Sequence, residues 1–352
     1  MVDDERATSA TLDAVAATHP VFLLSWSGHV ALLNSKALRR LQISESEADP
    51  AGGVFSRGEN GSQLSGLAYE YACTRLVQGL FAETPIAGHA RWLAEFATSA
   101  VEHRVTTVQL MPDLQPRVVR ELVANPALAV RIRIIDMPLN VTQWTPDRVT
   151  RPASETVSFS GLKIILDGAP IERWSRLRQP YADRPTTSGH LNFTPHALQD
   201  ILRRAMAAGE PPMIHASGDA AVDAALDALE ATGGTRWAPL RPRIEHADGF
   251  GVEHVERARR MGIIVVQNPS HFSLATGWKE RLGASRVQHY QQVRMILEAG
   301  IPLAFGSDGP FNPFLNIMFA TTNPTNPSQA VDGPSGPPGV HVRLGGGRTT
   351  RA

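Results

Sequence analysis

Short apolar runs alternate with longer amphipathic segments from about residue 100 onward. The amphipathic stretches at residues 194–209 and 219–234 have the apolar spacing of helices, and the second ends in a Gly-Gly pair. Runs that are apolar on both faces and separated by helices indicate parallel βαβ units. The strand-like runs are residues 106–111, 129–137, 161–168, 211–219, 241–248, 262–269 and 301–308. Seven such units favour an α/β fold of the (β/α)8 TIM-barrel type.

The first hundred residues follow a different pattern. Residues 19–41 read as a β-like run, a turn and a helix, and residues 51–71 read as a hairpin with a polar tip. We interpret residues 1–100 as an insertion or lid, and residues 101–330 as barrel units. In residues 331–352, nine of 22 positions are Gly or Pro, so this tail is predicted to be disordered.

Composition narrows the functional classes. The 352-residue chain has a formal net charge of zero, so no overall field favours nucleic acid or an anionic membrane. No apolar run approaches the ~18 residues of a membrane span, and the acidic start lacks the pattern of a secretory signal. The single cysteine, Cys73, cannot form an internal disulfide. A cytoplasmic protein is the expectation.

Four of the predicted strands carry a side chain that can bind a metal. Lys163, His215, His246 and Asp308 lie in the strands that span residues 161–168, 211–219, 241–248 and 301–308. Parallel strands of a barrel present their C-terminal ends to one face, so these side chains are expected to converge. Two imidazoles and a carboxylate suit Zn²⁺ or a similar divalent ion.

Several motifs resemble those of the amidohydrolase superfamily. They are "GLKIILDGAP", "IHASGDAAVDAALDALE", "RIEHADGFGVEHVERARRMGIIVVQNPSHF" and "ILEAGIPLAFGSDGPFNP", preceded by "TLDAVAATHPVFLLSWSGHVALLNSKAL". The resemblance runs from about residue 10 to residue 330. It is strongest to the amidohydrolase-3 branch, which includes the N-substituted formamide deformylase-like, metal-dependent hydrolases. In that branch the N-terminal motif belongs to an insertion between the first two barrel strands.

The resemblance implies a role for each strand-end residue. Lys163 matches a lysine that bridges two metal ions once it is carbamylated, and His215 and His246 match the histidines of the second metal. Asp308 matches the aspartate that binds a metal and acts as the catalytic general base. The metal activates a water molecule and polarises the scissile carbonyl.

The same resemblance implies a substrate. His29 and His271 match positions beside the substrate pocket. The implied activity is hydrolysis of an amide-type C–N bond in a small molecule.

The chain departs from the family pattern in its metal ligands. No His-x-His pair, which ends the first barrel strand of the family, occurs in the sequence. We therefore expect an incomplete barrel without its first strand, which holds one metal ion or none and associates into homo-oligomers through exposed strand edges. Two alternatives to the binuclear hydrolase stay open: an inactive fragment or pseudoenzyme, and a single-metal hydrolase that uses His215, His246 and Asp308.

Overall fold

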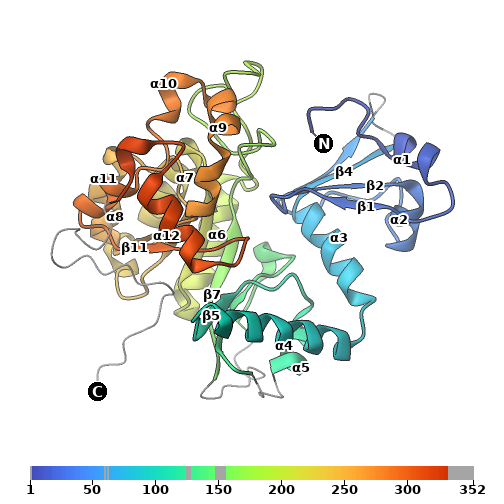
Figure 1. Ribbon diagram of the computed structural model, residues 1–352, viewed down its shortest axis with the longest axis horizontal. Coiled ribbons are helices and arrows are strands. Elements are labelled where there is room, and N and C mark those ends of the chain that lie inside the picture. Colours follow the sequence, from blue (N-terminus) through green and yellow to red (C-terminus); the bar gives the residue numbers. More distant parts are fainter. Residues whose placement is uncertain (1, 59–60, 62, 124–127, 147–155, 332–352) are drawn as a thin grey trace.

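The computed structural model describes residues 2–58, 61, 63–123, 128–146 and 156–331 (Figure 1). The predicted disordered tail therefore lies outside the described residues, apart from Val331. Two sheets organise the chain. A four-stranded antiparallel sheet is built from the N-terminal segment, and a seven-stranded parallel sheet from the rest.

The antiparallel sheet has the strand order β1-β2-β4-β3. Its strands are β1 (Phe22–Leu24), β2 (Val30–Leu33), β3 (Gly53–Arg57) and β4 (Leu64–Glu70), and the accompanying helices are α1 (Ser9–Val15) and α2 (Ser35–Arg40). The antiparallel pairing of β3 with β4 confirms the predicted hairpin. The segment before α2 contains one more strand than predicted, because the fully buried β2 turns back along β1.

The parallel sheet confirms all seven predicted strands, which follow one another in chain order across the sheet. The strands are β5 (Thr107–Leu110), β6 (Arg131–Asp136), β7 (Val157–Ile165), β8 (Pro212–Ala216), β9 (Arg243–His246), β10 (Ile264–Gln267) and β11 (Leu303–Phe305). Every neighbouring pair in this sheet is parallel, so all seven C-terminal ends lie at one edge.

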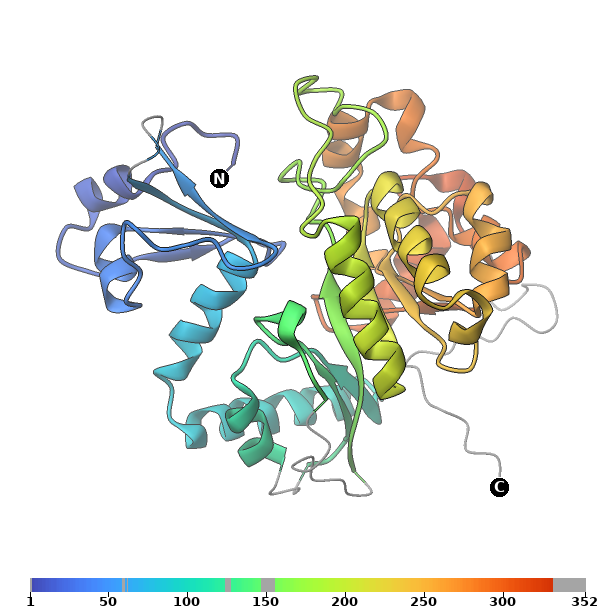
Figure 2. The ribbon, with the colours of Figure 1, turned by 180° about the vertical axis from the view of Figure 1, so that it is seen from behind.

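Helices connect the two sheets and cover the parallel one (Figures 1 and 2). Their bounds are α3 (Tyr71–Ala82), α4 (Ile86–Glu102), α5 (Pro116–Val123), α6 (Pro195–Ala208), α7 (Asp219–Thr232), α8 (Val255–Met261), α9 (Ala275–Leu282), α10 (Ala284–Val287), α11 (Val293–Glu298) and α12 (Pro313–Thr322). The two predicted helices correspond to α6 and α7. Thr194 caps the start of α6, and Gly209 ends it in a left-handed conformation that glycine adopts without strain.

Two apolar clusters hold the parallel sheet to its helices. The larger one packs β7, β8 and β9 against α6 and α7, with Ile164, Ile214 and Leu226 fully buried. A second cluster packs β5 and β6 against α4 and α5. Helix α4 lies inside the segment predicted to be an insertion, but it contacts the parallel sheet. The interpretation of residues 1–100 as an insertion between barrel strands stays a prediction.

The parallel sheet is curled and covers part of a barrel. Strands β5 and β11 are its outer strands, and among the described residues each pairs with one neighbour only. A closed eight-stranded barrel is therefore not confirmed. Residues 20–26 contribute β1 to the antiparallel sheet, where it pairs with β2. Within the described ranges, no helix combines the length and the apolar character needed to cross a membrane.

Candidate metal centre

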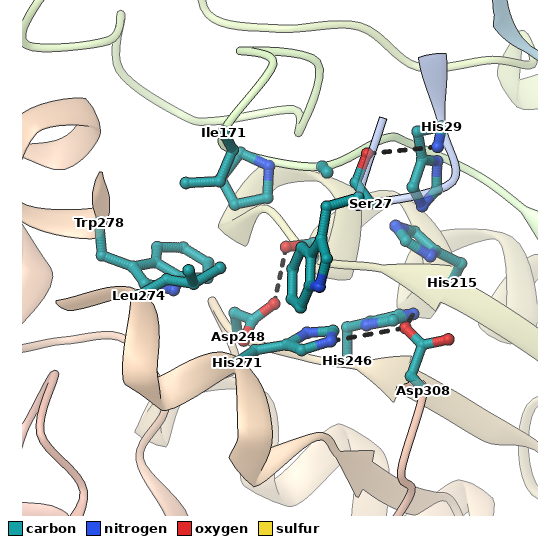
Figure 3. A pocket seen from close by; sticks show the side chains of 14 residues that line it. Ser27, His29, Ile171, His215, His246, Asp248, His271, Leu274, Trp278 and Asp308 are labelled. Atoms are coloured by element: carbon teal, nitrogen blue, oxygen red, sulfur yellow. Dashed lines mark hydrogen bonds and ion pairs between the residues drawn. The ribbon is translucent and has the colours of Figure 1, made fainter. Parts of the chain in front are cut away.

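The C-terminal edge of the parallel sheet gathers the predicted site residues (Figure 3). Strand β7 carries Lys163, β8 carries His215, and β9 ends at His246. Asp308 follows β11 by three residues and has a left-handed backbone conformation, with φ at 42°. The fold therefore places side chains from four strands at one edge, as the strand pattern predicts.

The tightest group of possible metal ligands consists of His246, His271 and Asp308. One ligand atom from each lies within 4.8 Å of the others. The Asp308 Oδ2 atom is 3.9 Å from Nε2 of His246 and 3.7 Å from Nε2 of His271. Ligands around a tetrahedral Zn²⁺, with bonds of ~2.0–2.2 Å, lie roughly 3.3–3.6 Å apart, so small shifts would bring these three atoms to ligand distance.

His215 lies beside this group. Its ring centroid is 4.1 Å from that of His246, and its buried Nε2 atom makes no hydrogen bond to any described residue. The Oδ1 atom of Asp167 lies 3.5 Å from this Nε2 atom. A buried ring nitrogen without a partner is costly unless something else binds it, so His215 is a further candidate ligand.

Lys163 is also buried, but it contacts a carboxylate and not the histidines. Its Nζ atom donates to Glu245 Oε2 at 3.3 Å, and Arg243 pairs with the other oxygen of Glu245 at 3.0 Å. A carbamate on Lys163 would have to displace this ion pair. The predicted bridging role of Lys163 stays a prediction.

His29 approaches the site from the antiparallel sheet. Its Nδ1 atom is 2.8 Å from Oε2 of Glu70, the last residue of β4, and its ring lies edge-on to His215 with centroids 4.7 Å apart. The opposite edge of the imidazole is thus left to face the other histidines. Ser27, next to His29 in the pocket wall, donates to Glu172 Oε1 at 2.7 Å.

The pKa shifts divide the site into groups of different charge. Burial lowers the pKa of His215 and of His246, which favours the neutral imidazoles that bind metals. Burial also opposes the charged form of His29, but the carboxylates of Glu70 and Glu172 outweigh it and raise its pKa to about 9. Burial raises the pKa of Asp308, but the electrostatic effect of the surrounding basic side chains, first His246, lowers it overall.

A pocket opens in front of these residues (Figure 3). Trp26, Ile171, Leu274 and Trp278 add apolar walls, and the ring of Trp26 lies edge-on to His271 with centroids 5.4 Å apart. The side chain of Asp308 is 55% exposed, so water and a ligand can reach it. The pocket combines a cluster of ligand-type side chains with room for an apolar group.

Comparison with known proteins identifies the family. A model described as the amidohydrolase family matches residues 2–336. The chain belongs to the amidohydrolase family. This confirms the resemblance to the amidohydrolase-3 branch, and members of the family depend on metal ions.

The relatives that match are longer than this chain. Putative amidohydrolase YtcJ of Bacillus subtilis is 28% identical over 346 residues, which are 93% of this chain and 63% of YtcJ. N-substituted formamide deformylase of Arthrobacter pascens is 26% identical over 337 residues, 88% of this chain and 59% of that protein. The chain thus spans less than two thirds of the length of these relatives.

Solved structures agree on the fold. An uncharacterized metal-dependent hydrolase from Pyrococcus horikoshii matches with a TM-score of 0.70 and 23% identity, over 93% of this chain and 66% of that one. A similar protein from Pyrococcus furiosus matches with a TM-score of 0.68.

The sequence reasoning missed two features of this site. It placed His271 beside the substrate pocket, which this residue does line, but it did not foresee that a ligand atom of His271 lies within 4.8 Å of those of His246 and Asp308. It also overlooked Glu70, the partner of His29. Glu70 is the last residue of β4, and His271 follows the end of β10 by four residues. A position at or near a strand end is also the feature from which the other four site residues were predicted.

Proposed function

We propose that this chain is a metal-dependent hydrolase that cleaves an amide-type C–N bond in a small molecule. The observation that carries the proposal is the convergence of His246, His271 and Asp308 at the mouth of a pocket. Membership of a metal-dependent family supports it.

The donor set fits a divalent ion. Two imidazoles and one carboxylate are a common ligand set for Zn²⁺, and the unpartnered Nε2 atom of His215 offers a fourth nitrogen nearby. We propose zinc held by His246, His271 and Asp308, with His215 as an additional ligand. Carbamylation of Lys163, with a second ion, is the alternative arrangement that the resemblance implies.

The bound ion would supply an activated water and would polarise the scissile carbonyl. Asp308 would accept the proton of that water, because its side chain is an exposed carboxylate that solvent in the pocket can reach. It would then return the proton to the leaving nitrogen. His29, held by Glu70 with one ring edge towards the pocket, would donate a hydrogen bond to the substrate.

The pocket walls suggest the substrate class. Trp26, Leu274 and Trp278 would contact an apolar substituent on one side of the amide. Since N-substituted formamide deformylase is among the relatives, N-substituted formamides are suitable first substrates.

A metal titration and a hydrolysis assay test the proposal together. We expect the metal-free chain to bind Zn²⁺, and Asp308→Asn to weaken binding by about 100-fold or more, because a ligand oxygen is replaced by a neutral amide. The zinc-loaded chain should release hexylamine from N-hexylformamide, and Asp308→Asn should not. Asp200→Asn, on the partly exposed face of α6, is the matched control.

Two outcomes would contradict the proposal. Unchanged zinc affinity in Asp308→Asn would remove Asp308 from the ligand set. Zinc binding without hydrolysis of any amide would favour the alternative of an inactive, metal-binding chain.

A further inference from the structure

A second pocket, which shares no lining residue with the first, lies between helices α3, α4 and α5, the outer strand β5 and its neighbour β6. Figure 1 shows these three helices beside the start of the parallel sheet. The pocket encloses about 250 Å³. This is just below the ~300–1,000 Å³ of typical ligand sites, so its occupant would be small.

The lining of this second pocket is almost entirely apolar. Leu93, Leu110 and Leu122 are among the aliphatic side chains that form its walls. Phe81, His89 and Trp92 add an aromatic side: the His89 ring lies edge-on to Trp92 at 5.5 Å and to Phe81 at 6.1 Å. The Nε2 atom of His89 is 3.0 Å from the Phe81 carbonyl oxygen, so this nitrogen is already engaged.

Asp113 is the single acidic residue of the lining. It follows β5 in the loop at the C-terminal edge of the sheet, and its Oδ1 atom is buried without a hydrogen-bond partner among the described residues. Among the described residues, no lysine or arginine lines the pocket to neutralise it. Burial raises the pKa of Asp113 to about 6, against a smaller opposing effect of His29, so the group is mostly a carboxylate above pH 7.

A buried carboxylate oxygen without a hydrogen-bond partner costs stability unless a ligand supplies the missing donor. The ligand must be apolar over most of its surface to fit these walls and must carry a positive N–H group to pair with Asp113. We propose that this pocket binds a small apolar primary amine in its ammonium form, with the ammonium on Asp113 and the hydrocarbon among Leu93, Leu122 and Trp92.

The proposal does not depend on the proposed hydrolase activity. Calorimetric titration of the full chain at pH 8 compares hexylammonium with 1-hexanol, which has the same chain length and no charge. We expect hexylammonium to bind about 10- to 100-fold more tightly, the range for a hydrogen bond to a charged group. Asp113→Asn should reduce this preference to near parity, and Leu122→Trp should weaken both ligands by filling the cavity.

Control variants locate the binding site. Asp308→Asn should leave hexylammonium binding unchanged, because Asp308 lies in the other pocket. Trp92→Phe should abolish the fluorescence change on binding but keep the calorimetric signal. Equal affinity for the two ligands, or an unchanged preference in Asp113→Asn, would overturn the proposal. A loss of binding in Asp308→Asn alone would place the amine at the metal centre and would overturn it as well.

Discussion

The two pockets of this chain treat buried charge in opposite ways. At the metal centre Glu70 has an ion-pair partner, because its Oε2 atom accepts from His29, although its Oε1 atom is buried without a hydrogen-bond partner. Asp308 Oδ2 lies 3.9 Å from His246 and 3.7 Å from His271. In the second pocket Asp113 has one oxygen with no partner and forms no ion pair with any described residue. Because a paired charge stabilises the fold and an unpaired one costs stability, the same type of side chain should give opposite results on removal.

Removing Glu70 should have the largest effect on stability. The Glu70 side chain is 1% exposed and its contact with His29 is 2.8 Å long. Breaking a buried ion pair costs about 3–5 kcal/mol, because the remaining group is left without its partner. We therefore expect Glu70→Ala to lower the free energy of unfolding by about this amount in urea denaturation at pH 7.

Glu70→Gln is the matched control, since glutamine keeps the size and an acceptor oxygen for His29. It should lose a smaller share of the stability than Glu70→Ala. The left-handed backbone of Glu70 (φ 53°) is common to all three proteins, so backbone strain does not confuse the comparison. A Glu70→Ala variant as stable as the parent would show that the pair adds nothing.

Asp113→Asn should raise the free energy of unfolding at neutral pH, which is the opposite of the effect of Glu70→Ala. The pKa of Asp113 is raised from 3.8 to about 6, mainly by burial, so the folded state resists ionising this group. The penalty is absent below pH 4, where folded and unfolded chains are both protonated, and it is complete above pH 6. A shift of this size corresponds to at most about 3 kcal/mol.

Urea denaturation across this pH window tests the sign. The parent should lose stability relative to Asp113→Asn as the pH rises from 4 to 6, and the difference should then stay constant up to pH 8. Asp200→Asn, at a partly exposed carboxylate on α6, is the control for removing an acidic side chain elsewhere. A constant difference from pH 4 to pH 8 would mean that Asp113 titrates normally in the folded chain.

The parallel sheet could be predicted from the sequence because its strands are apolar on both faces and regularly spaced. All seven predicted runs overlap observed strands. Strand β2 was missed because Val30–Leu33 directly precedes the Asn34 cap of α2, so the turn and the strand were merged with the helix. Pairing between distant segments decided its conformation, and a local pattern does not contain that information.

From the sequence, only the site residues at the ends of predicted strands could be identified. Lys163, His215, His246 and Asp308 follow from the parallel topology, but the distance of His271 from Asp308 depends on the 3₁₀ turn Pro269–Leu274. The pairing of Lys163 with Glu245 joins β7 to β9 across the intervening strand β8, and the two residues are 82 positions apart in the sequence. The second pocket gave no sequence signal, since a cavity arises from the packing of helices that are individually ordinary.

Substitutions of the tryptophans in the two pockets should have the smallest effects on the free energy of unfolding. Trp278 at the metal centre is 2% exposed, whereas Trp92 at the second pocket is 45% exposed. Trp278→Phe should lower the free energy of unfolding by about 1–2 kcal/mol, because the smaller ring leaves a cavity that the loss of the unpaired Nε1–H only partly offsets. Trp92→Phe should change it by less than about 0.5 kcal/mol, as for other exposed positions. Parallel urea titrations of the two variants measure this difference. Equal losses would mean that Trp92 is packed as tightly as Trp278, and the second pocket would then be closed in solution.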